Sequence, residues 1–366
     1  MFTFLRPLKT GLCILLFSLL ATKEGYSWGF AAHSTINKLA VALLPQPLLN
    51  FFMPYQSYLS EHAVDPDKRR YIDSLEASRH YIDLEFYESQ LPLDTIPHFW
   101  KSALTKYGQK HLNDFGSLPW QIQRSMWKLR IAFCEKNLQK ILQNAAELGH
   151  YVADAHVPLH TTANYDGQLT QQRGIHALWE TKIPDLSFES YSTVFPNANF
   201  WFSESDTIFN ILEESHALVP MILAAQKTIN QLITEQYRYA IKVNANSGKP
   251  TKDYANAYLL ACERAMENSV SNRMRMSIYR VASCWLTCWI LAGQPTLPIK
   301  QFQKTRRKSI HHPTSINAQS KFPLMEFSAL PDSTLLGNKE IGIHKFEMDS
   351  LINLQNPFDP CRNNHK

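Results

Sequence analysis

Apolar residues recur at three- and four-residue spacing along most of this 366-residue chain. This spacing places them on one face of an α-helix, and the alternating pattern of half-buried strands is scarce. The segments with the helical pattern are 33–53, 97–113, 119–157, 205–245 and 252–293. We therefore expect an all-α fold, a multi-helix bundle whose large core draws on the 45% of residues that are hydrophobic.

Prolines and a glycine divide these helical segments. Pro158 ends the helix that runs through 119–157, because proline cannot donate the backbone hydrogen bond of a helix interior. Pro220 is expected to kink the next long helix, and Gly293 to stop the last one. The sequence shows no internal repeat.

The first 27 residues have the pattern of a secretory signal peptide. A short apolar run, 11–21, follows two basic residues and precedes small residues that end at Ser27. The run is too short for a typical membrane span, although an uncleaved N-terminal anchor is the alternative. We expect cleavage after Ser27, export to the periplasm or the cell exterior, and a mature chain that begins at Trp28.

Charge and cysteine content add two limits. The formal net charge of +5 would fall to +3 on loss of residues 1–27, which gives little support for nucleic-acid binding through a broadly basic surface. No later stretch is apolar enough to predict a transmembrane segment. Cys284 and Cys288 lie one helical turn apart in an apolar segment, so buried thiols are the preferred interpretation.

The helical pattern ends near residue 300. From 301 to 366 the chain contains a basic cluster, 304–308, and scattered serine, asparagine and proline. We expect one folded domain over 28–300 and a flexible or loosely packed tail over 301–366. The basic cluster is interpreted as a solvated charge run. The purpose of this tail and the oligomeric state do not follow from the sequence.

Possible metal ligands occur at fixed offsets in the middle of the chain. His150 and Asp154 are four residues apart on a predicted helix, so one face presents both to a single metal ion. His160 follows a proline, leaves the helix axis and can serve a second ion. His176 and Glu180 repeat the four-residue step. Imidazole and carboxylate groups are the usual protein ligands of zinc, and two such pairs favour a metal centre over surface histidines.

A second set of possible ligands lies upstream. Asp65 precedes His80 by fifteen residues, and His33 follows Trp28 by five. If the signal peptide is removed, the free amine and the carbonyl oxygen of Trp28 can chelate a metal ion, and His33 can complete that site.

Together these residues resemble the ligand set of the zinc-dependent phospholipase C and single-strand-specific (S/P-type) nuclease superfamily. The resemblance covers 28–180 and implies three Zn²⁺ ions on an all-α fold. It assigns the first ion to Asp65, His80, His150 and Asp154. It assigns the second to His160, His176 and Glu180, and the third to Trp28, His33 and a bridging Asp154.

The resemblance also implies an activity, the hydrolysis of phosphodiester bonds. Bound zinc ions would attract the phosphate and lower the pKa of the attacking water. Asp65 is the candidate for orienting or deprotonating that water. Lys68 or Arg69 is the candidate phosphate clamp: in the nucleases an arginine stands three positions after the aspartate, and here that position is Lys68.

The substrate class is left between phospholipid and single-stranded nucleic acid. Tyr81 and Asp83 match the aromatic residue and aspartate that hold a base in the nucleases, although a packed tyrosine beside a structural aspartate explains them equally well. Glu180, the sixteen-residue step from His160 to His176, and the lack of a Gly-Gly-Asn stretch between them favour the phospholipases. We therefore expect a phosphodiesterase of the phospholipase C type.

A non-catalytic alternative is a helical binding protein whose fold is stabilised by structural zinc. Structural zinc sites are usually closed by four protein ligands, whereas the site of His160, His176 and Glu180 has three and leaves a position for water or substrate. This open coordination favours an enzyme.

Overall fold

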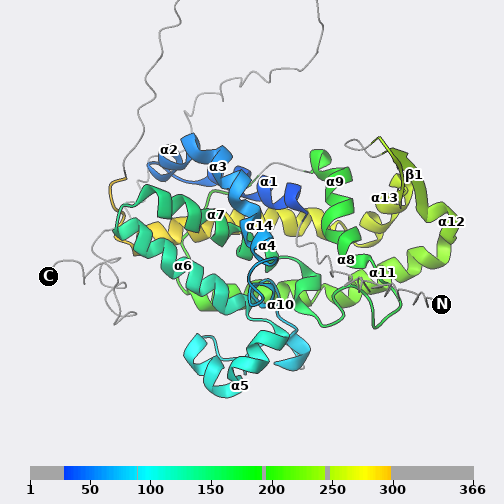
Figure 1. The fold of residues 1–366 in the computed structure, drawn as a ribbon, viewed down its shortest axis with the longest axis horizontal. Helices are drawn as coiled ribbons and strands as arrows, with labels where there is room; N and C mark the ends of the chain where they lie inside the picture. Colours follow the sequence, from blue (N-terminus) through cyan, green and yellow to red (C-terminus); the bar gives the residue numbers. More distant parts are fainter. Residues whose placement is uncertain (1–28, 89, 192–194, 244–247, 298–366) are drawn as a thin grey trace, which may run out of the picture.

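The computed structural model describes residues 29–88, 90–191, 195–243 and 248–297. Over these ranges the chain forms a bundle of helices with one small hairpin (Figure 1). The expected all-α, multi-helix fold is confirmed. The α-helices are α1 (Phe30–Ala40), α2 (Leu48–Phe52), α3 (Gln56–Glu61), α4 (Asp65–Arg69), α5 (Trp100–Phe115), α6 (Leu118–Cys134), α7 (Leu138–Asp154), α8 (Ile175–Ala177), α9 (Ile183–Ser187), α10 (Glu204–His216), α11 (Val219–Leu232), α12 (Glu235–Arg238), α13 (Asn256–Ala265) and α14 (Ser269–Leu291).

Short helical turns connect many of these helices. The 3₁₀ turns are η1 (Val41–Leu43), η2 (Met53–Tyr55), η3 (His62–Val64), η4 (Ala77–Arg79), η5 (Leu84–Phe86), η6 (Pro158–Thr161) and η8 (Phe188–Ser190). The remaining turn, η7 (Leu178–Lys182), is a π-helix. Single π-turns are rare and often mark functional sites.

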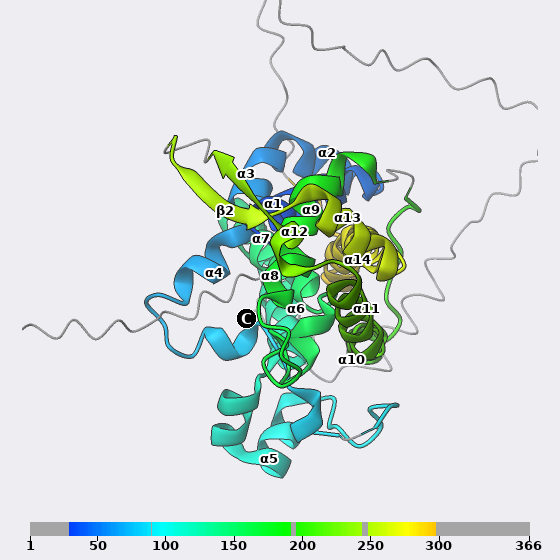
Figure 2. The same cartoon turned by 90° about the vertical axis from the view of Figure 1, so that its right-hand side faces the viewer.

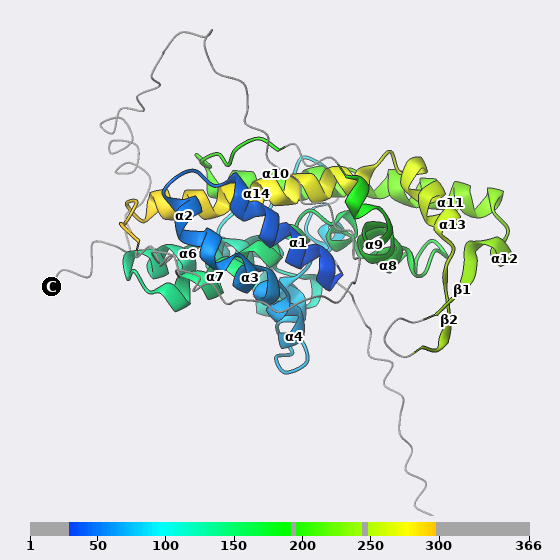
Figure 3. The same cartoon turned by 90° about the horizontal axis from the view of Figure 1, so that it is seen from above.

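Helix α7 lies at the centre of the bundle and packs against α1, α6 and α14 (Figures 1 and 3). The indole of Trp285, on α14, is fully buried; it stacks on Phe52 at 5.4 Å and donates from Nε1 to the carbonyl oxygen of Ala145, 2.9 Å away. Cys284 and Cys288 are free and buried on the same helix, as expected. This packing fixes α7, which carries His150 and Asp154.

Two of the expected long helices are each divided by a turn. The segment 119–157 breaks between α6 and α7, where Lys136 has a φ of 52° and the side chain of Asn137 caps α7 by accepting from Lys140 N at 3.0 Å. The segment 252–293 breaks before α14, where Asn268 has a φ of 56°. Asparagine tolerates the left-handed region better than most residues, so polar turn residues outweigh the continuous apolar period.

The expectation of a helix over 205–245 is wrong at its end. Residues Tyr239–Val243 form strand β1, which pairs antiparallel with β2 (Pro250–Tyr254) so that Tyr239 lies opposite Tyr254. The two tyrosine rings stack at 5.3 Å, a cross-strand contact that a helix would not provide. The expected kink is a full break, because α11 begins at Val219 with Pro220 in its first turn.

Helix α5 projects from the side of the bundle in Figures 1 and 2. It follows the irregular segment 70–99 and returns to the bundle at Gly116, which forms an isolated bridge with Ile82. The segment that contains His80 is thereby attached at both sides, to α4 before it and to the end of α5 after it.

By length and composition alone, the helical stretch Glu204–Leu232 could cross a membrane. This is weak evidence, since core helices of soluble proteins pass the same test, and α10 and α11 break this stretch at residues 217–218. The expected absence of a transmembrane segment therefore stays a prediction. The expected signal peptide, Trp28 and the tail over 301–366 lie outside the described residues.

Candidate metal centre

His150 and Asp154 project from one face of α7, as their four-residue spacing predicts. Both side chains are fully buried, and His150 Nε2 lies 3.2 Å from Asp154 Oδ2. His150 Nδ1 lies 2.8 Å from the carbonyl oxygen of Ala63, which can only accept, so Nδ1 carries the proton. Nε2 of His150 is then the nitrogen whose lone pair is available to a metal ion.

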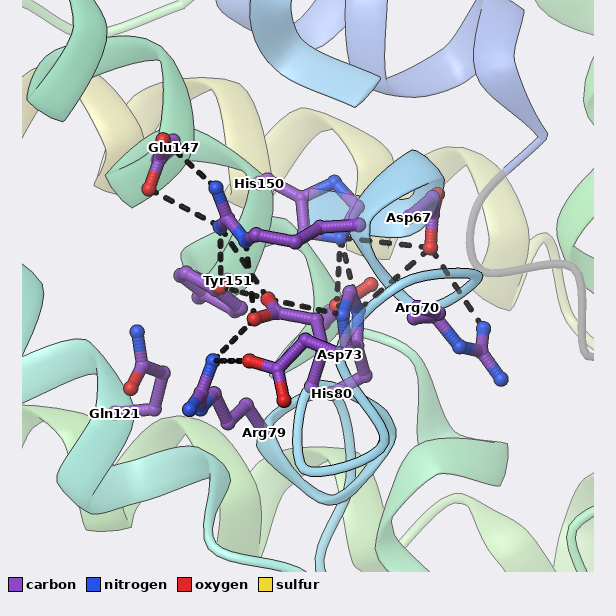
Figure 4. A network of polar contacts seen from close by, with 12 residues as sticks. Asp67, Arg70, Asp73, Arg79, His80, Gln121, Glu147, His150 and Tyr151 are labelled. Atoms are coloured by element: carbon purple, nitrogen blue, oxygen red, sulfur yellow. Dashed lines mark hydrogen bonds and ion pairs between the residues drawn. The ribbon is translucent and has the colours of Figure 1, made fainter. Parts of the chain in front are cut away.

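The first group of possible ligands combines α4, the segment before α5, and α7 (Figure 4). His80 Nδ1 lies 3.0 Å from His150 Nε2, 2.9 Å from Asp154 Oδ2 and 3.7 Å from an oxygen of Asp67. Asp67, His80 and His150 each offer a ligand atom within 4.8 Å of the others, and all three are buried. Asp154 adds a carboxylate oxygen to this group.

The expected ligand Asp65 is replaced by Asp67. Asp65 points away from the group: its side chain is 34% exposed and pairs with His62 Nδ1 at 2.5 Å and with Lys68 Nζ at 2.9 Å. Residues two apart on a helix face nearly opposite directions, so α4 can aim only one of the two aspartates inward. Asp67, and not Asp65, therefore faces the other possible ligands.

The two expected phosphate clamps are also engaged elsewhere. Lys68 pairs with Asp65 at the surface, and Arg69 contacts Glu76 and Glu147, beside α7. Counted from Asp67, the arginine three positions later is Arg70, whose Nη1 lies 3.7 Å from Asp67 Oδ1. The cationic residue at the expected spacing is therefore Arg70, and this spacing is the sequence signal that could have identified Asp67 in place of Asp65.

The second group of possible ligands contains His160, His176 and Glu180, all buried. Glu180 Oε2 lies 3.1 Å from His176 Nε2 and 3.4 Å from His160 Nε2. His160 lies on η6, off the axis of α7, as expected after Pro158. Glu180 lies in the π-turn η7, which changes the direction of side chains relative to a regular helix.

Asp154 faces both groups and a third position. Its Oδ2 faces His80 and His150, whereas its Oδ1 lies 3.4 Å from His33 Nε2 and 3.5 Å from His160 Nδ1. The ring of His33, on α1, stacks on His150 with centroids 3.9 Å apart. His33, His150 and Asp154 form the third buried set with metal-ligand geometry.

Trp28, the remaining expected ligand, lies outside the described residues. The next residue, Gly29, donates its backbone N–H to the carbonyl oxygen of Glu180 at 3.3 Å. A Cβ at Gly29 would approach Thr181 Cγ2 to 2.9 Å, so this position is closely packed against η7. The described chain therefore begins directly beside the ligands of the second group.

The chemistry of these side chains fits divalent cations. Several buried ligand atoms have no hydrogen-bond partner within the described residues, namely both oxygens of Asp67, both oxygens of Glu180, Nδ1 of His160 and Nε2 of His176. Buried polar atoms are rarely left without a partner, and a bound cation supplies one. Nitrogen and oxygen donors in this proportion are typical of zinc sites.

Burial also sets the ionisation of these groups. It raises the pKa of Glu180 to about 8, and it lowers the pKa of His176 to about 4, which keeps that imidazole neutral as a metal ligand requires. Burial alone would raise the pKa of Asp154, but the imidazoles of His150 and His160 lower it well below its usual range. A positive charge at the centre would favour the ionised forms of both carboxylates.

The predicted substrate residues lie next to His80 on an immobilised segment. Ile82 N donates to the carbonyl oxygen of His160 at 2.9 Å, which ties this segment to the second ligand group. Tyr81 is partly exposed and its hydroxyl donates to the carbonyl oxygen of Asp114. Burial and the carboxylate of Glu85 raise the pKa of Asp83 to about 7. The backbone that carries Tyr81 and Asp83 is thus joined to the first ligand group by His80 and to the second by Ile82.

Buried imidazole and carboxylate groups in metal-ligand geometry on a helical bundle are typical of metal-dependent hydrolases. The family model of S1/P1 nuclease matches residues 28–284, and the chain therefore belongs to the S1/P1 nuclease family. This membership makes the protein a hydrolase of the phosphodiesterase and nuclease type, and it implies a nucleic-acid substrate. No curated protein matches the chain.

Proposed function

We propose that the protein is a zinc-dependent nuclease that hydrolyses phosphodiester bonds in single-stranded nucleic acid. The observation that carries this proposal is the position of Tyr81 and Asp83, one and three residues beyond the buried ligand His80. A base held by this segment would bring its own phosphate to the ligand groups. Neither residue could reach a base that is paired and stacked in a duplex.

The proposed metal ligands, as the structure arranges them, are Asp67, His80, His150 and Asp154 for one ion, His160, His176 and Glu180 for a second, and His33 and Asp154 with Trp28 for a third. Bound zinc supplies positive charge for the phosphate and acidifies water. Three ions remain a proposal that follows the superfamily.

We assign proton transfer, phosphate binding and base binding to side chains. Both oxygens of Asp67 are buried without a hydrogen-bond partner in the described chain, so either can accept a proton from the attacking water. Arg70 is placed to hold a phosphate oxygen, since its guanidinium lies at the edge of the same carboxylate. Tyr81 offers a ring face to a base, and Asp83 offers oxygens to its amino groups.

Phospholipase C activity is the second candidate. Two observations favour it, the carboxylate Glu180 at the last ligand position and the short step between His160 and His176. The family match and the Asp67–Arg70 spacing favour the nuclease. We therefore rank nucleic acid above phospholipid as the substrate, which reverses the preference expected from the sequence.

Export of the protein is part of the proposal. Cleavage after Ser27 would leave Trp28 with a free amine, one peptide unit from Gly29 and thus within reach of Glu180 and its group. A variant that keeps one residue before Trp28 replaces this amine with an amide and should bind one zinc ion fewer. Equal zinc content in the two forms would contradict the third site.

The test of function is hydrolysis by the protein that begins at Trp28, loaded with zinc, on three substrates in parallel: single-stranded DNA, the same sequence as a duplex, and phosphatidylcholine vesicles. We expect cleavage of the single strand, a much slower reaction on the duplex, and none in His160→Ala. Release of phosphocholine without DNA cleavage would establish the phospholipase. A folded, fully metallated protein inactive on all three would favour structural zinc.

Tyr81→Ala separates base binding from catalysis. Stacking contributes about 1–3 kcal/mol per base, so KM for DNA should rise by roughly 5- to 150-fold while zinc content stays unchanged. Tyr81→Phe is the matched control, because it keeps the ring and removes only the hydroxyl that contacts Asp114. An unchanged KM in Tyr81→Ala would show that the ring does not hold a base.

A further inference from the structure

We propose that Glu76 is a positioning residue for the metal centre, which orients His80 through the ring nitrogen opposite the metal. This inference rests on the proposed zinc site but does not depend on the substrate. Glu76 has no counterpart among the ligands that the sequence indicated, and it lies four residues before His80, in the irregular segment that leads to η4.

The imidazole of His80 lies between two acidic groups. Its Nδ1 faces Asp154 at 2.9 Å and the first ligand group, whereas its Nε2 lies 3.6 Å from Glu76 Oε1. Within the described residues this buried Nε2 has no hydrogen-bond partner, so Glu76 is the carboxylate at which it points. Histidine ligands usually donate their second N–H to a carboxylate or carbonyl, which fixes the ring and raises its basicity.

Glu76 itself is fully buried, and three side chains donate hydrogen bonds to its carboxylate. Arg69 donates to its Oε2 from Nε at 3.1 Å and approaches Oε1 with Nη2 at 3.4 Å. Arg79 donates to Oε2, and the hydroxyl of Tyr151 donates to Oε1 (Figure 4). Three neighbouring side chains thus hold the Glu76 carboxylate in place.

Two residues that hold Glu76 and its partner Arg69 in place lie on α7, the helix that carries His150 and Asp154. Tyr151 follows His150 on α7, and its ring lies 5.5 Å from that of His80. Glu147, one turn earlier on α7, binds Arg69 through two hydrogen bonds of 3.0 and 3.1 Å. Helix α7 thus presents His150 and Asp154 to the metal on one side and anchors the partner of His80 on the other.

A purely structural role for Glu76 would be to neutralise Arg69 and Arg79. Glu147 neutralises Arg69 only: it pairs with this guanidinium as closely as Glu76 does, and it makes no contact with His80 among the described residues. The chain therefore offers a matched pair of carboxylates on one guanidinium, of which only Glu76 also approaches a metal ligand.

The test compares Glu76→Gln with Glu147→Gln in the protein that begins at Trp28. Zinc affinity is measured by competition with a chelator, and the visible absorption of the Co²⁺-substituted protein reports ligand geometry. We expect Glu76→Gln to bind one ion roughly 10- to 100-fold more weakly, with an altered Co²⁺ spectrum. Glu147→Gln should keep its affinity within about threefold and its spectrum unchanged.

Equal zinc affinities and equal spectra in the two variants would overturn the proposal and leave Glu76 a structural counter-ion. If Glu76→Gln does not fold, Tyr151→Phe replaces it, because it removes one donor to Glu76 and keeps the aromatic ring. Weaker binding of one ion is again the expected result, and unchanged binding of every ion the contradicting one. Since the readout is metal affinity, the proposal can hold in a protein that cleaves no nucleic acid.

Discussion

The contact between Gly149 and Asn37 joins α7 to α1, and its disruption gives a test of how the centre is assembled. A Cβ at Gly149 would lie 2.0 Å from Oδ1 and 2.8 Å from Cγ of Asn37. Asn37 cannot simply turn away, because its Nδ2 donates to the carbonyl oxygens of Leu59 at 3.1 Å and Ala146 at 3.0 Å. Gly149→Ala therefore forces α1 outward or breaks these hydrogen bonds.

The expected effect follows from three contributions. Overpacking a core costs about 1–3 kcal/mol, and a buried amide deprived of partners about 1–3 kcal/mol. Alanine in place of glycine inside a helix returns about 1 kcal/mol. We expect Gly149→Ala to lower the free energy of unfolding by about 3 kcal/mol. His33 lies one turn before Asn37 on α1. Movement of α1 should therefore also lower the affinity for the zinc ion proposed to bind between His33 and Asp154.

Guanidinium denaturation in saturating zinc measures this effect, and the double variant separates its origins. In an Asn37→Ala background the clash is absent, so Gly149→Ala should be neutral or stabilise the protein by up to about 1 kcal/mol. The same destabilisation in both backgrounds would refute the steric explanation, because the loss would then not depend on the Asn37 side chain.

Three further results are expected. Gly116→Ala, where the φ is +93° and a Cβ would lie 2.2 Å from the Tyr81 carbonyl oxygen, should lower both the melting temperature and the affinity for single-stranded DNA. Burial raises the pKa of Glu214, but hydrogen bonds from Arg280 and Arg273 hold it below its ordinary value. Its stabilisation is present above the unfolded pKa, about 4.3, and is lost as pH falls through the folded pKa. Wild type should thus exceed Glu214→Gln in urea midpoint at pH 7, with the difference shrinking below about pH 4; a constant difference would argue against the ion pair. Chelation of zinc should lower the melting temperature, whereas an unchanged value would place the ions outside the folded core.

The fold class follows from the sequence, but the joints between helices do not. Apolar periodicity predicts α7 and α14 well, because each buries a continuous stripe. The apolar periodicity continues across the turn at Asn137 and does not predict it, because α6 and α7 both present apolar residues to the same core. The hairpin at Tyr239 is missed because its pairing partner, Tyr254, is distant in sequence and alternation over five residues is a short pattern.

The ligand set shows the same limit at one position. Fixed offsets on a regular helix identify His150 and Asp154 because helical geometry dictates their common face. Asp65 and Asp67 precede His80 by fifteen and thirteen residues across an irregular segment, so the spacing from His80 does not choose between them, and only Arg70, three residues after Asp67, favours Asp67. The choice depends on the direction in which α4 enters the bundle, a tertiary property. Glu76 was missed because its role is defined only by the nitrogen of His80 that it faces.

The three buried carboxylates explain why such a centre must form as one unit. Asp67, Asp154 and Glu180 are almost inaccessible to water, and burying ionised carboxylates without compensation costs several kcal/mol each. The imidazoles around them compensate only if protonated. Against the effect of burial, Asp154 and Glu76 raise the pKa of His80 to about 9, so this ring can supply one positive charge, whereas burial lowers the pKa of His176 to about 4 and that of His33 below its ordinary value. The missing positive charge is therefore best supplied by bound cations. Since Asp154 faces every group, we expect loss of one of the proposed ions to alter the charge that the others experience, so that folding, metal binding and substrate attraction would be coupled through that carboxylate.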